Sequence, residues 1–228
     1  MKKTERNEYD ELLPLLPLSI TTIQVQKKNK ERFSIFHEDR FLLGVSSQTL
    51  VKCSLKKGTL LTTDVIEHIF EVEQYNKAKD YCLGLLSRRD HSVKELILKG
   101  IKKGFFKEIL VRITQELQQQ GYLDDQRFAL NFMHDAIEFR KWSLTKINVE
   151  LQKKGVNKVI ISELLSGLDD SIWKEQIFGL VQKNKAKFRR TDSNKRIKKI
   201  YDYLARKGYN STLIWSEMNN LLLLIENK

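Results

Sequence analysis

Two adjacent carboxylates, Asp124 and Asp125, are the side chains in this 228-residue chain that most invite an acid–base or metal-binding interpretation. No histidine or third carboxylate lies at ligand spacing from them. An aspartate just before Phe128 and Ala129 instead favours the N-cap of a helix, because its carboxylate accepts hydrogen bonds from the first free backbone N–H groups. The sequence therefore predicts a helix start here and no catalytic residue.

The cysteines and histidines also lack the pattern of a chemical site. Two distant cysteines make neither a disulfide framework nor a zinc site, and the four histidines are scattered. These residues are Cys53, Cys82, His37, His68, His91 and His134. We expect no metal and no cofactor.

The positive charge is concentrated in one part of the chain. The formal net charge is +12, yet residues 1–75 hold 11 basic and 11 acidic side chains, so residues 76–228 hold the whole excess. Eleven basic and two acidic residues lie between Lys183 and Lys207 alone. Clustered lysine and arginine gain free energy by releasing phosphate counterions, which favours a polyanionic partner. A solvated surface with no partner is the alternative, and charge alone supports both interpretations equally.

Three short words repeat through this basic part: Lys102-Lys-Gly-Phe105, Lys153-Lys-Gly-Val156 and Arg206-Lys-Gly-Tyr209. The glycines are 51 and 53 residues apart. Apolar residues recur at fixed offsets from each glycine, namely eight before it and five, six and thirteen after it. The words and the apolar columns together indicate three internal repeats.

Each repeat predicts a module of three helices. Residues eight and four before the glycine share one helix face, the basic pair complements the dipole of the last turn, and the glycine allows a left-handed C-cap. A second helix follows the glycine, and a preceding helix completes the module. Ser92 and Ser143 are the expected N-caps of the middle helix, and Asp192 or Ser193 takes this role in the third repeat.

A further position, four residues before each repeated glycine, holds Leu151 and Leu204 in the second and third repeats. Gly100 stands there in the first repeat and is the exception. Two explanations are open. Either a large neighbour such as Phe105 or Phe106 fills the space, or the helix is kinked.

The residues before the repeats have a β-type pattern. Three short runs, at residues 20–26, 32–36 and 41–45, are rich in β-branched and aromatic residues and are separated by polar turns. They predict a small antiparallel meander that must pack on another element. Thr63-Asp64 predicts the start of a helix that runs to Val72.

The apolar stretch from Leu12 to Ile20 is not expected to be a targeting signal. It is short, it is interrupted by Pro14 and Pro17, and acidic residues precede it. No stretch of the chain reaches membrane-spanning length. We therefore expect a cytoplasmic protein.

Three segments have family-like words: Ser87–Leu96, Lys102–Phe105 and the word Gly-Tyr-Leu-Asp-Asp-Gln-Arg-Phe-Ala at residues 121–129. Together they resemble the RecX family, the regulators of the RecA recombinase. Residues 20–30 and 45–58 are similar to the N-terminal extension of RecX proteins from some bacterial groups. The resemblance covers roughly residues 20–222, and it departs from the family pattern at Gly100 and around residues 187–195.

The resemblance implies a mainly α fold of three tandem three-helix repeats, forming an elongated curved array and preceded by a small β-rich N-terminal segment. We predict the N-terminal extension at residues 1–72 and the three repeats at 73–122, 123–170 and 171–228.

The resemblance also implies a non-enzymatic regulator that binds the RecA–DNA filament and inhibits strand exchange and ATP hydrolysis in recombination, DNA repair and the SOS response. The expected partners are RecA and single- or double-stranded DNA, with no membrane, and the expected state is a monomer. A stand-alone helix-turn-helix-like DNA-binding protein is the alternative, because small three-helix modules and a charge of +12 also suit it.

The residues predicted to contact a partner are all basic. They comprise a pair at a helix end, the three repeated pairs, a pair beside Trp142, and the dense cluster in the third repeat: Arg88, Arg89, Lys102, Lys103, Lys153, Lys154, Arg206, Lys207, Arg140, Lys141, Arg189, Arg190, Lys195, Arg196, Lys198 and Lys199. The competing interpretation is that each is a solvated helix-cap cation, and that Trp142 belongs to a core between modules.

Overall fold

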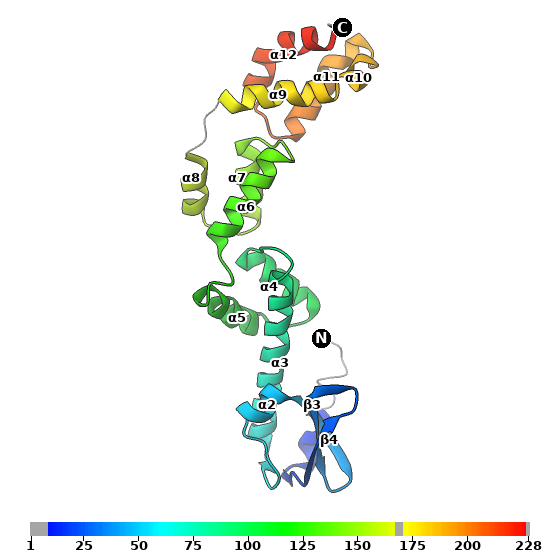
Figure 1. The fold of residues 1–228 in the computed structure, drawn as a ribbon, viewed down its shortest axis with the longest axis vertical. Coiled ribbons are helices and arrows are strands. Elements are labelled where there is room, and N and C mark those ends of the chain that lie inside the picture. The colour runs from blue at the N-terminus through cyan, green and yellow to red at the C-terminus, as the bar shows by residue number, and fades with distance from the viewer. Residues whose placement is uncertain (1–8, 167–170, 227–228) are drawn as a thin grey trace. The chain divides into compact units, whose positions relative to one another are not determined.

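The computed structural model describes residues 9–166 and 171–226 and is mainly helical, with a small β-rich segment before the helices (Figure 1). The chain divides into two compact units, the first ending at Leu123 and the second beginning at Asp124. The first unit holds the β-rich segment and one three-helix module, and the second holds two further modules. The predicted class, three helical modules after a β-rich segment, is confirmed.

The predicted antiparallel meander is present at the N-terminal side of the first unit. Its strands, in spatial order, are β2 (Thr22–Gln26), β3 (Asn29–His37) and β4 (Arg40–Ser46). Ile35 in β3 pairs with Ile23 on one side and Leu43 on the other, and both Ile35 and Leu43 are fully buried. The alternation of apolar and polar residues in these runs therefore does place one face of the sheet in a core.

A second, two-stranded sheet was not predicted. It pairs β1 (Leu18–Ser19) with β5 (Leu60–Leu61), and the 3₁₀ helix η1 (Leu13–Leu15) and helix α2 (Ser47–Lys52) complete this region. Two-residue strands are too short to show a period of two, so only the packed structure reveals them.

Helix α3 (Thr63–Leu86) corrects the prediction of a helix that ends at Val72, and the predicted domain boundary after residue 72 lies inside it. Its N-cap is Thr62, one residue earlier than expected. No proline interrupts the 24 residues, and the helix has buried residues along its length. Ile66 and Ile69 pack in the core of the β-rich segment, whereas Ala78 and Cys82 pack in the first helical module. One helix thus serves two cores.

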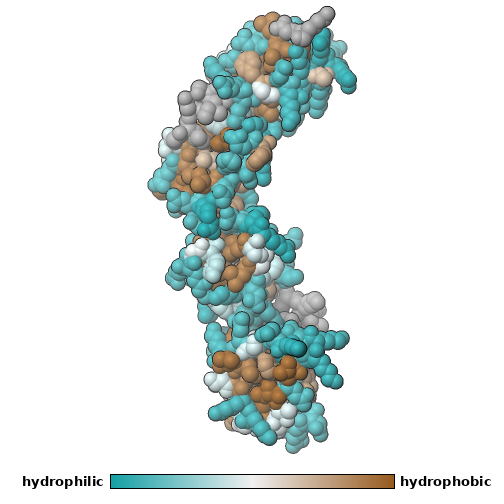
Figure 2. Space-filling view, viewed as in Figure 1, coloured by the Kyte–Doolittle hydropathy of each residue, from teal (hydrophilic) through white to brown (hydrophobic). Residues whose placement is uncertain are grey.

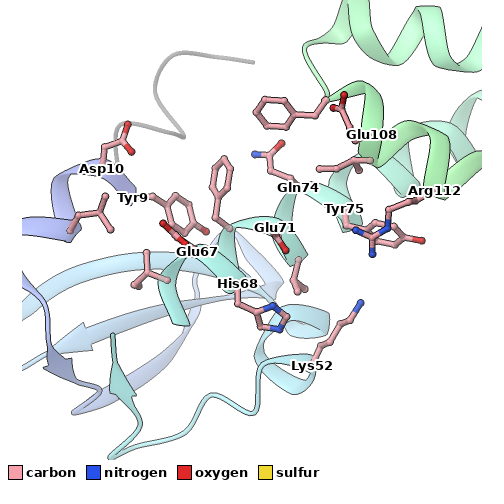
Figure 3. Close-up of a pocket in the computed structure, with 16 residues that line it drawn as sticks. Tyr9, Asp10, Lys52, Glu67, His68, Glu71, Gln74, Tyr75, Glu108 and Arg112 are labelled. Carbon is pink, nitrogen blue, oxygen red and sulfur yellow. The ribbon is translucent and has the colours of Figure 1, made fainter. Parts of the chain in front are cut away.

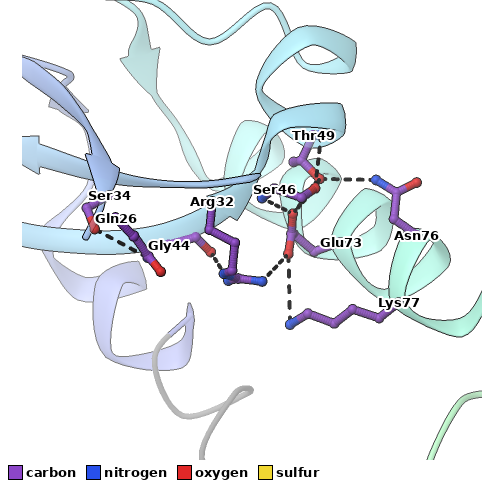
Figure 4. Close-up of polar contacts among 9 residues, drawn as sticks. All are labelled: Gln26, Arg32, Ser34, Gly44, Ser46, Thr49, Glu73, Asn76 and Lys77. Carbon is purple, nitrogen blue, oxygen red and sulfur yellow. Dashed lines mark hydrogen bonds and ion pairs between the residues drawn. The ribbon is translucent and has the colours of Figure 1, made fainter. Parts of the chain in front are cut away.

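A buried carboxylate joins the sheet region to α3 (Figure 4). Glu73 is 1% exposed, and its Oε1 accepts hydrogen bonds from Ser46 N (2.7 Å), Ser46 Oγ (2.8 Å) and Thr49 Oγ1 (2.5 Å). Its Oε2 lies 3.6 Å from Arg32 Nη1 and 3.8 Å from Lys77 Nζ. The network links the end of β4 and the start of α2 to the middle of α3, so it fixes the helix against the sheet.

Three modules of three main helices follow, as the repeats predicted. The first module combines the C-terminal half of α3 with α4 (Val93–Lys103) and α5 (Lys107–Gln119). The second consists of α6 (Asp125–Glu138), α7 (Leu144–Lys153) and α8 (Lys158–Ser166). The third consists of α9 (Ser171–Lys183), α10 (Lys185–Arg189), α11 (Ser193–Arg206) and α12 (Ser211–Glu226). The short α10 accounts for the divergent lead-in of the third repeat, because its Phe188 is buried in that module's core.

The repeated residues take equivalent roles in the three modules. The residues eight before each glycine, Leu96, Ile147 and Ile200, are all fully buried, each in the core of its own module. The glycines have φ of 103° (Gly104), 83° (Gly155) and 92° (Gly208), the left-handed conformation expected of C-caps. Of the residues thirteen after the glycine, Leu117 and Leu221 are buried, and Leu168 lies outside the described residues.

The middle helix of each module is capped as predicted. Ser92 Oγ accepts from Glu95 N, Ser143 Oγ accepts from Lys146 N, and the Asp192 side chain accepts from Asn194 N. Asp192, rather than Ser193, is therefore the cap of the third repeat.

A large neighbour does fill the space beside Gly100, but it is Leu110 rather than Phe105 or Phe106. Helix α4 is continuous through Gly100, and the space is filled by Leu110 of α5. A Cβ at residue 100 would lie 2.6 Å from Leu110 Cδ1, closer than real Cβ contacts. The glycine therefore allows α4 and α5 to approach closely, and a side chain from the next helix replaces the missing one.

Candidate partner-binding surfaces

Of the two adjacent carboxylates, Asp124 caps helix α6. Asp124 accepts hydrogen bonds from Gln126 N (2.8 Å) and Arg127 N (3.1 Å), and Asp125 begins α6. Across residues 9–166 and 171–226, no group of three or more His, Cys, Asp or Glu side chains is arranged to hold a metal ion.

A cluster of three cations and three aromatic rings lies on the second module. We call Phe128, Phe132, Trp142, Arg140, Lys146 and Lys154 the cation–aromatic cluster. The Arg140 guanidinium lies 4.8 Å from the Trp142 ring centre and 5.4 Å from that of Phe132. Lys146 Nζ lies 4.7 Å from the Trp142 ring, and Lys154 Nζ lies 5.3 Å from the Phe132 ring. Each distance is within the range of cation–π attraction.

Three local features of the sequence build this cluster. Phe128 and Phe132 are four residues apart in α6, so they share a face, and their ring centres are 6.0 Å apart. The loop after α6 turns at Lys141, whose φ is 52°, and this brings Trp142 within 6.1 Å of Phe132. Lys154 is the C-cap residue of α7, the second cation of the repeated pair.

The cluster can contact a polyanion that also carries flat rings. Phe128 is buried, but Phe132 and Trp142 are only half-buried, and Arg140 is exposed. Partly exposed rings can stack with nucleic-acid bases while the adjacent cations contact phosphates. Trp142 is partly buried and packs on the core of the second module, rather than in a core between modules, and its neighbourhood is cationic.

We expect the double substitution Arg140→Gln and Lys154→Gln to weaken binding of a single-stranded oligonucleotide. If each cation contacts one phosphate, the slope of log affinity against log salt concentration falls by roughly 0.7 per lost contact. The measurement is fluorescence anisotropy of a labelled oligonucleotide over a salt series. The control is Lys158→Gln with Lys174→Gln, which removes the same charge from exposed positions of the second unit. Equal slopes for the two double variants would contradict the assignment.

In the third repeated basic pair, Lys207 holds the second and third modules together, whereas Arg206 is exposed and contributes only its main-chain carbonyl. Lys207 Nζ donates to Arg140 O (2.5 Å), and Lys207 O accepts from Ser143 N (2.9 Å). Lys146 Nζ donates to Arg206 O. Burial, together with the nearby charges of Lys146 and Lys183, lowers the pKa of Lys207. Lys207 is therefore a structural cation of the joint between these modules.

The other two repeated pairs are more accessible. Lys102 and Lys103 are exposed in the last turn of α4. Lys153 is exposed and pairs with Glu150 at 2.8 Å, which lowers the pKa of that carboxyl group through its hydrogen bond. Equivalent positions in the repeat thus have three different environments.

The dense cluster of the third module is divided between structure and surface. The Arg196 side chain is 14% exposed; it bonds Thr191 O at 3.3 Å and pairs with Glu226 at 3.2 Å. Lys199 Nζ donates to Thr191 Oγ1 at 2.8 Å. These two cations hold the turn before α11, so they are not free for a partner. The exposed members of the cluster are Arg189, Arg190, Lys195 and Lys198.

The remaining predicted cations lie at helix ends. Arg89 donates to Asp90 O (2.7 Å) and pairs with Glu95 (3.2 Å), so it supports the start of α4, whereas Arg88 is exposed. Lys141 Nζ lies 3.8 Å from Glu138, and its carbonyl accepts from Tyr209 Oη in the joint. Arg89 was expected to act as a helix-cap cation. In the structure it pairs with Glu95 in the first turn of the following helix, α4.

A stacked aromatic pair on the third module was missed. The Tyr201 and Trp215 ring centres are 5.5 Å apart with an interplanar angle of 29°, and Trp215 is 55% exposed. Tyr201 in α11 and Trp215 in α12 are 14 residues apart, so no local spacing predicts the contact. Figure 2 shows hydrophobic residues in brown among hydrophilic residues in teal on the face in view.

Four family models match the chain in succession, and together they cover more than half of it. They describe the RecX N-terminal domain (residues 19–62) and the first, second and third RecX three-helix domains (78–109, 124–165 and 174–217). The chain belongs to the RecX family. The resemblance seen in its motifs is therefore confirmed, and the repeats of the sequence are the three helical domains of RecX proteins.

Curated relatives are named regulatory protein RecX. That of Clostridioides difficile is 29% identical over 89% of this chain and 95% of its own length, and that of Staphylococcus carnosus is 27% identical over 89% and 75%. The fold matches a crystal structure of regulatory protein RecX with a TM-score of 0.66 at 24% identity, covering 86% of this chain and 96% of the other. It also matches RecX from Lactobacillus salivarius with a TM-score of 0.54 at 20% identity, covering 67% and 99%. The structural matches support the same fold.

No helix within residues 9–166 and 171–226 is both long and apolar enough to cross a membrane.

Proposed function

We propose that this RecX protein binds the RecA filament on DNA and inhibits its strand exchange and ATP hydrolysis. The observation that carries the proposal is the match of all four RecX models, in order, to one chain whose relatives are named regulatory proteins. The protein acts by binding rather than by chemistry in this proposal, as a monomer in the cytoplasm during recombination and DNA repair.

The distribution of exposed cations supports contact with a polyanionic filament. The second unit carries the cation–aromatic cluster and the exposed cations Arg189, Arg190, Lys195 and Lys198, and the first unit carries Lys102 and Lys103. We assign these as the residues that approach DNA or an acidic surface of RecA, because solvated cations attract polyanions at long range. Arg196, Lys199 and Lys207 are excluded from this set, and so is Lys146 of the cation–aromatic cluster, since the contacts of their charged groups are internal.

The experiment that tests the proposal is RecA strand exchange with increasing amounts of the protein. We expect a stoichiometric excess to reduce joint-molecule formation and RecA ATP hydrolysis at least severalfold. A variant in which Arg189, Arg190, Lys195 and Lys198 are all glutamine should inhibit less, since it loses electrostatic attraction. Full strand exchange in the presence of excess wild-type protein would contradict the proposal.

The second candidate is a DNA-binding protein that acts without RecA. The cation–aromatic cluster favours it, because half-buried rings beside cations suit single-stranded nucleic acid whatever else is present. Retardation of an oligonucleotide by the protein alone, together with an absence of any effect on RecA, would favour this candidate. Inhibition of RecA at protein concentrations too low to bind the free oligonucleotide would favour the first.

A further inference from the structure

We propose that a pocket in the first unit binds a basic, partly apolar peptide segment of a protein partner (Figure 3). The inference deepens the proposed function, on which it rests for the identity of that partner as RecA. The pocket has a volume of about 590 Å³ and lies along α3, between residues 9–13 and the first turns of α5. This volume is in the range of ligand pockets and accommodates a few side chains.

Aromatic rings form much of the wall of this pocket. Tyr9 and Phe70 meet edge to face with ring centres 5.0 Å apart, and Phe106 at the start of α5 is 38% exposed. Figure 3 shows Tyr9 approaching from the segment before η1 toward α3. Partly exposed rings on facing walls can enclose an aliphatic side chain or the methylene groups of a lysine or arginine.

The rim of the pocket is acidic, although the protein as a whole is basic. Exposed carboxylates line it from three segments: Asp10, Glu67, Glu71 and Glu108. Two cations, Lys52 and Arg112, also line the pocket, but both lie against the Tyr75 ring, at 5.3 and 5.5 Å from its centre. The carboxylates outnumber the cations, so the rim favours a positive ligand and disfavours nucleic-acid phosphates.

Gln74 offers hydrogen-bonding groups to a ligand in the pocket. Its side chain lines the pocket, the residue is only 3% exposed, and Figure 3 shows the amide directed into the space between Tyr9 and Glu108. No hydrogen bond of this amide is found in the described part of the chain. Its amide atoms are not among the fully buried polar atoms that lack a partner, so they remain accessible from the pocket. A peptide main chain can supply both a donor and an acceptor to this amide.

The three features together specify one kind of occupant. Aromatic walls take an apolar group, the acidic rim takes a lysine or arginine, and the Gln74 amide pairs with a peptide bond. Nucleic acid meets the first requirement but not the second. A basic peptide segment meets all three, so the first unit is assigned to the protein partner and the cation–aromatic cluster of the second unit to the nucleic acid.

The test uses overlapping synthetic peptides that cover the RecA sequence, each labelled for fluorescence anisotropy with the full-length protein. We expect the bound peptides to carry net positive charge. Glu67→Lys with Glu71→Lys should weaken their binding about tenfold or more. The matched control is Glu163→Lys with Glu175→Lys, which makes the same charge change at exposed positions of the second unit.

Gln74→Leu separates binding from folding. Leucine keeps the buried volume and removes an amide that makes no hydrogen bond within the protein, so the midpoint of thermal unfolding should not fall, while peptide binding should weaken about three- to tenfold. If no RecA peptide binds the wild-type protein, or if pocket variants and control bind alike, the inference is overturned. Failure of the wild-type protein to inhibit strand exchange, with basic peptides still bound at this pocket, would overturn the proposed function alone.

Discussion

Replacement of Glu73 by alanine is expected to lower the free energy of unfolding of the first unit by about 3–5 kcal/mol. The substitution removes the acceptor of Ser46 N, Ser46 Oγ and Thr49 Oγ1 at once, and it leaves Arg32 and Lys77 without the carboxylate they face. Breaking a buried ion pair from one side is costly because the remaining donors and charges stay partly desolvated. Glu73→Gln should cost less, since its amide oxygen can still accept from Ser46 and Thr49.

The two units carry different natural reporters for this measurement. Both cysteines lie in the first unit, and Trp142, Trp173 and Trp215 all lie in the second. Cys82 is fully buried, and burial raises its thiol pKa to about 11, so it reacts with an alkylating reagent only when the first unit opens. Labelling of Cys82 across a urea series is read by mass spectrometry, and its midpoint should shift to a lower urea concentration in Glu73→Ala. The unfolding transition of the second unit, followed by tryptophan fluorescence and called the tryptophan transition below, should keep its midpoint.

Glu71→Ala is the matched control for Glu73, because it removes an exposed carboxylate from the same helix two residues away. It should leave the free energy of opening that protects Cys82 from labelling within about 0.5 kcal/mol of the wild-type value. Equal protection of Cys82 in the Glu71 and Glu73 variants would show that the buried network does not hold α3 to the sheet.

Gly208→Ala is expected to destabilise the second unit by about 2–5 kcal/mol, from the left-handed conformation and from overpacking together. Gly208 has φ 92°, and a Cβ there would overlap the Lys146 Cβ and lie 2.6 Å from Ser143 Oγ. The backbone must move to relieve the overlap, and this breaks the bonds from Ser143 N to Lys207 O and from Ser143 Oγ to Gly208 O. The tryptophan transition should therefore move to lower urea, with Cys82 protection unchanged.

Two other glycines distinguish the causes. Gly121 has φ 74° with nothing within 4 Å of an added Cβ, so Gly121→Ala bears only the conformational cost, about 1–2 kcal/mol. Gly179 lies in α9 with open space around it, and alanine there should be neutral or slightly stabilising. If Gly208→Ala lowers the free energy of unfolding no more than Gly121→Ala does, the joint between the second and third modules accommodates the added methyl group without an energetic penalty.

Much of the helical part could be predicted because its signals are local. Leu96, Ile147 and Ile200 stand at the same offset from repeated glycines, and each is fully buried in its own module. The caps at Ser92, Ser143 and Asp192 bond backbone groups two or three residues away, so the sequence near each cap is enough to identify it. The unbroken α3 was harder to predict, because its two ends serve different cores and no single apolar face runs along it.

The sequence by itself determined the family, the three repeats and the helix ends of this protein, since these depend on neighbours within a few turns of the chain. Only the tertiary structure decided which cations are free. Lys207 meets the carbonyl of Arg140, 67 residues away, and Arg196 meets Glu226, 30 residues away, whereas Lys198 stays exposed. The pocket around Gln74 likewise forms only when α5 packs beside α3. Contacts between residues distant in the chain leave no periodic trace in the sequence, because they are fixed by packing and not by local backbone geometry.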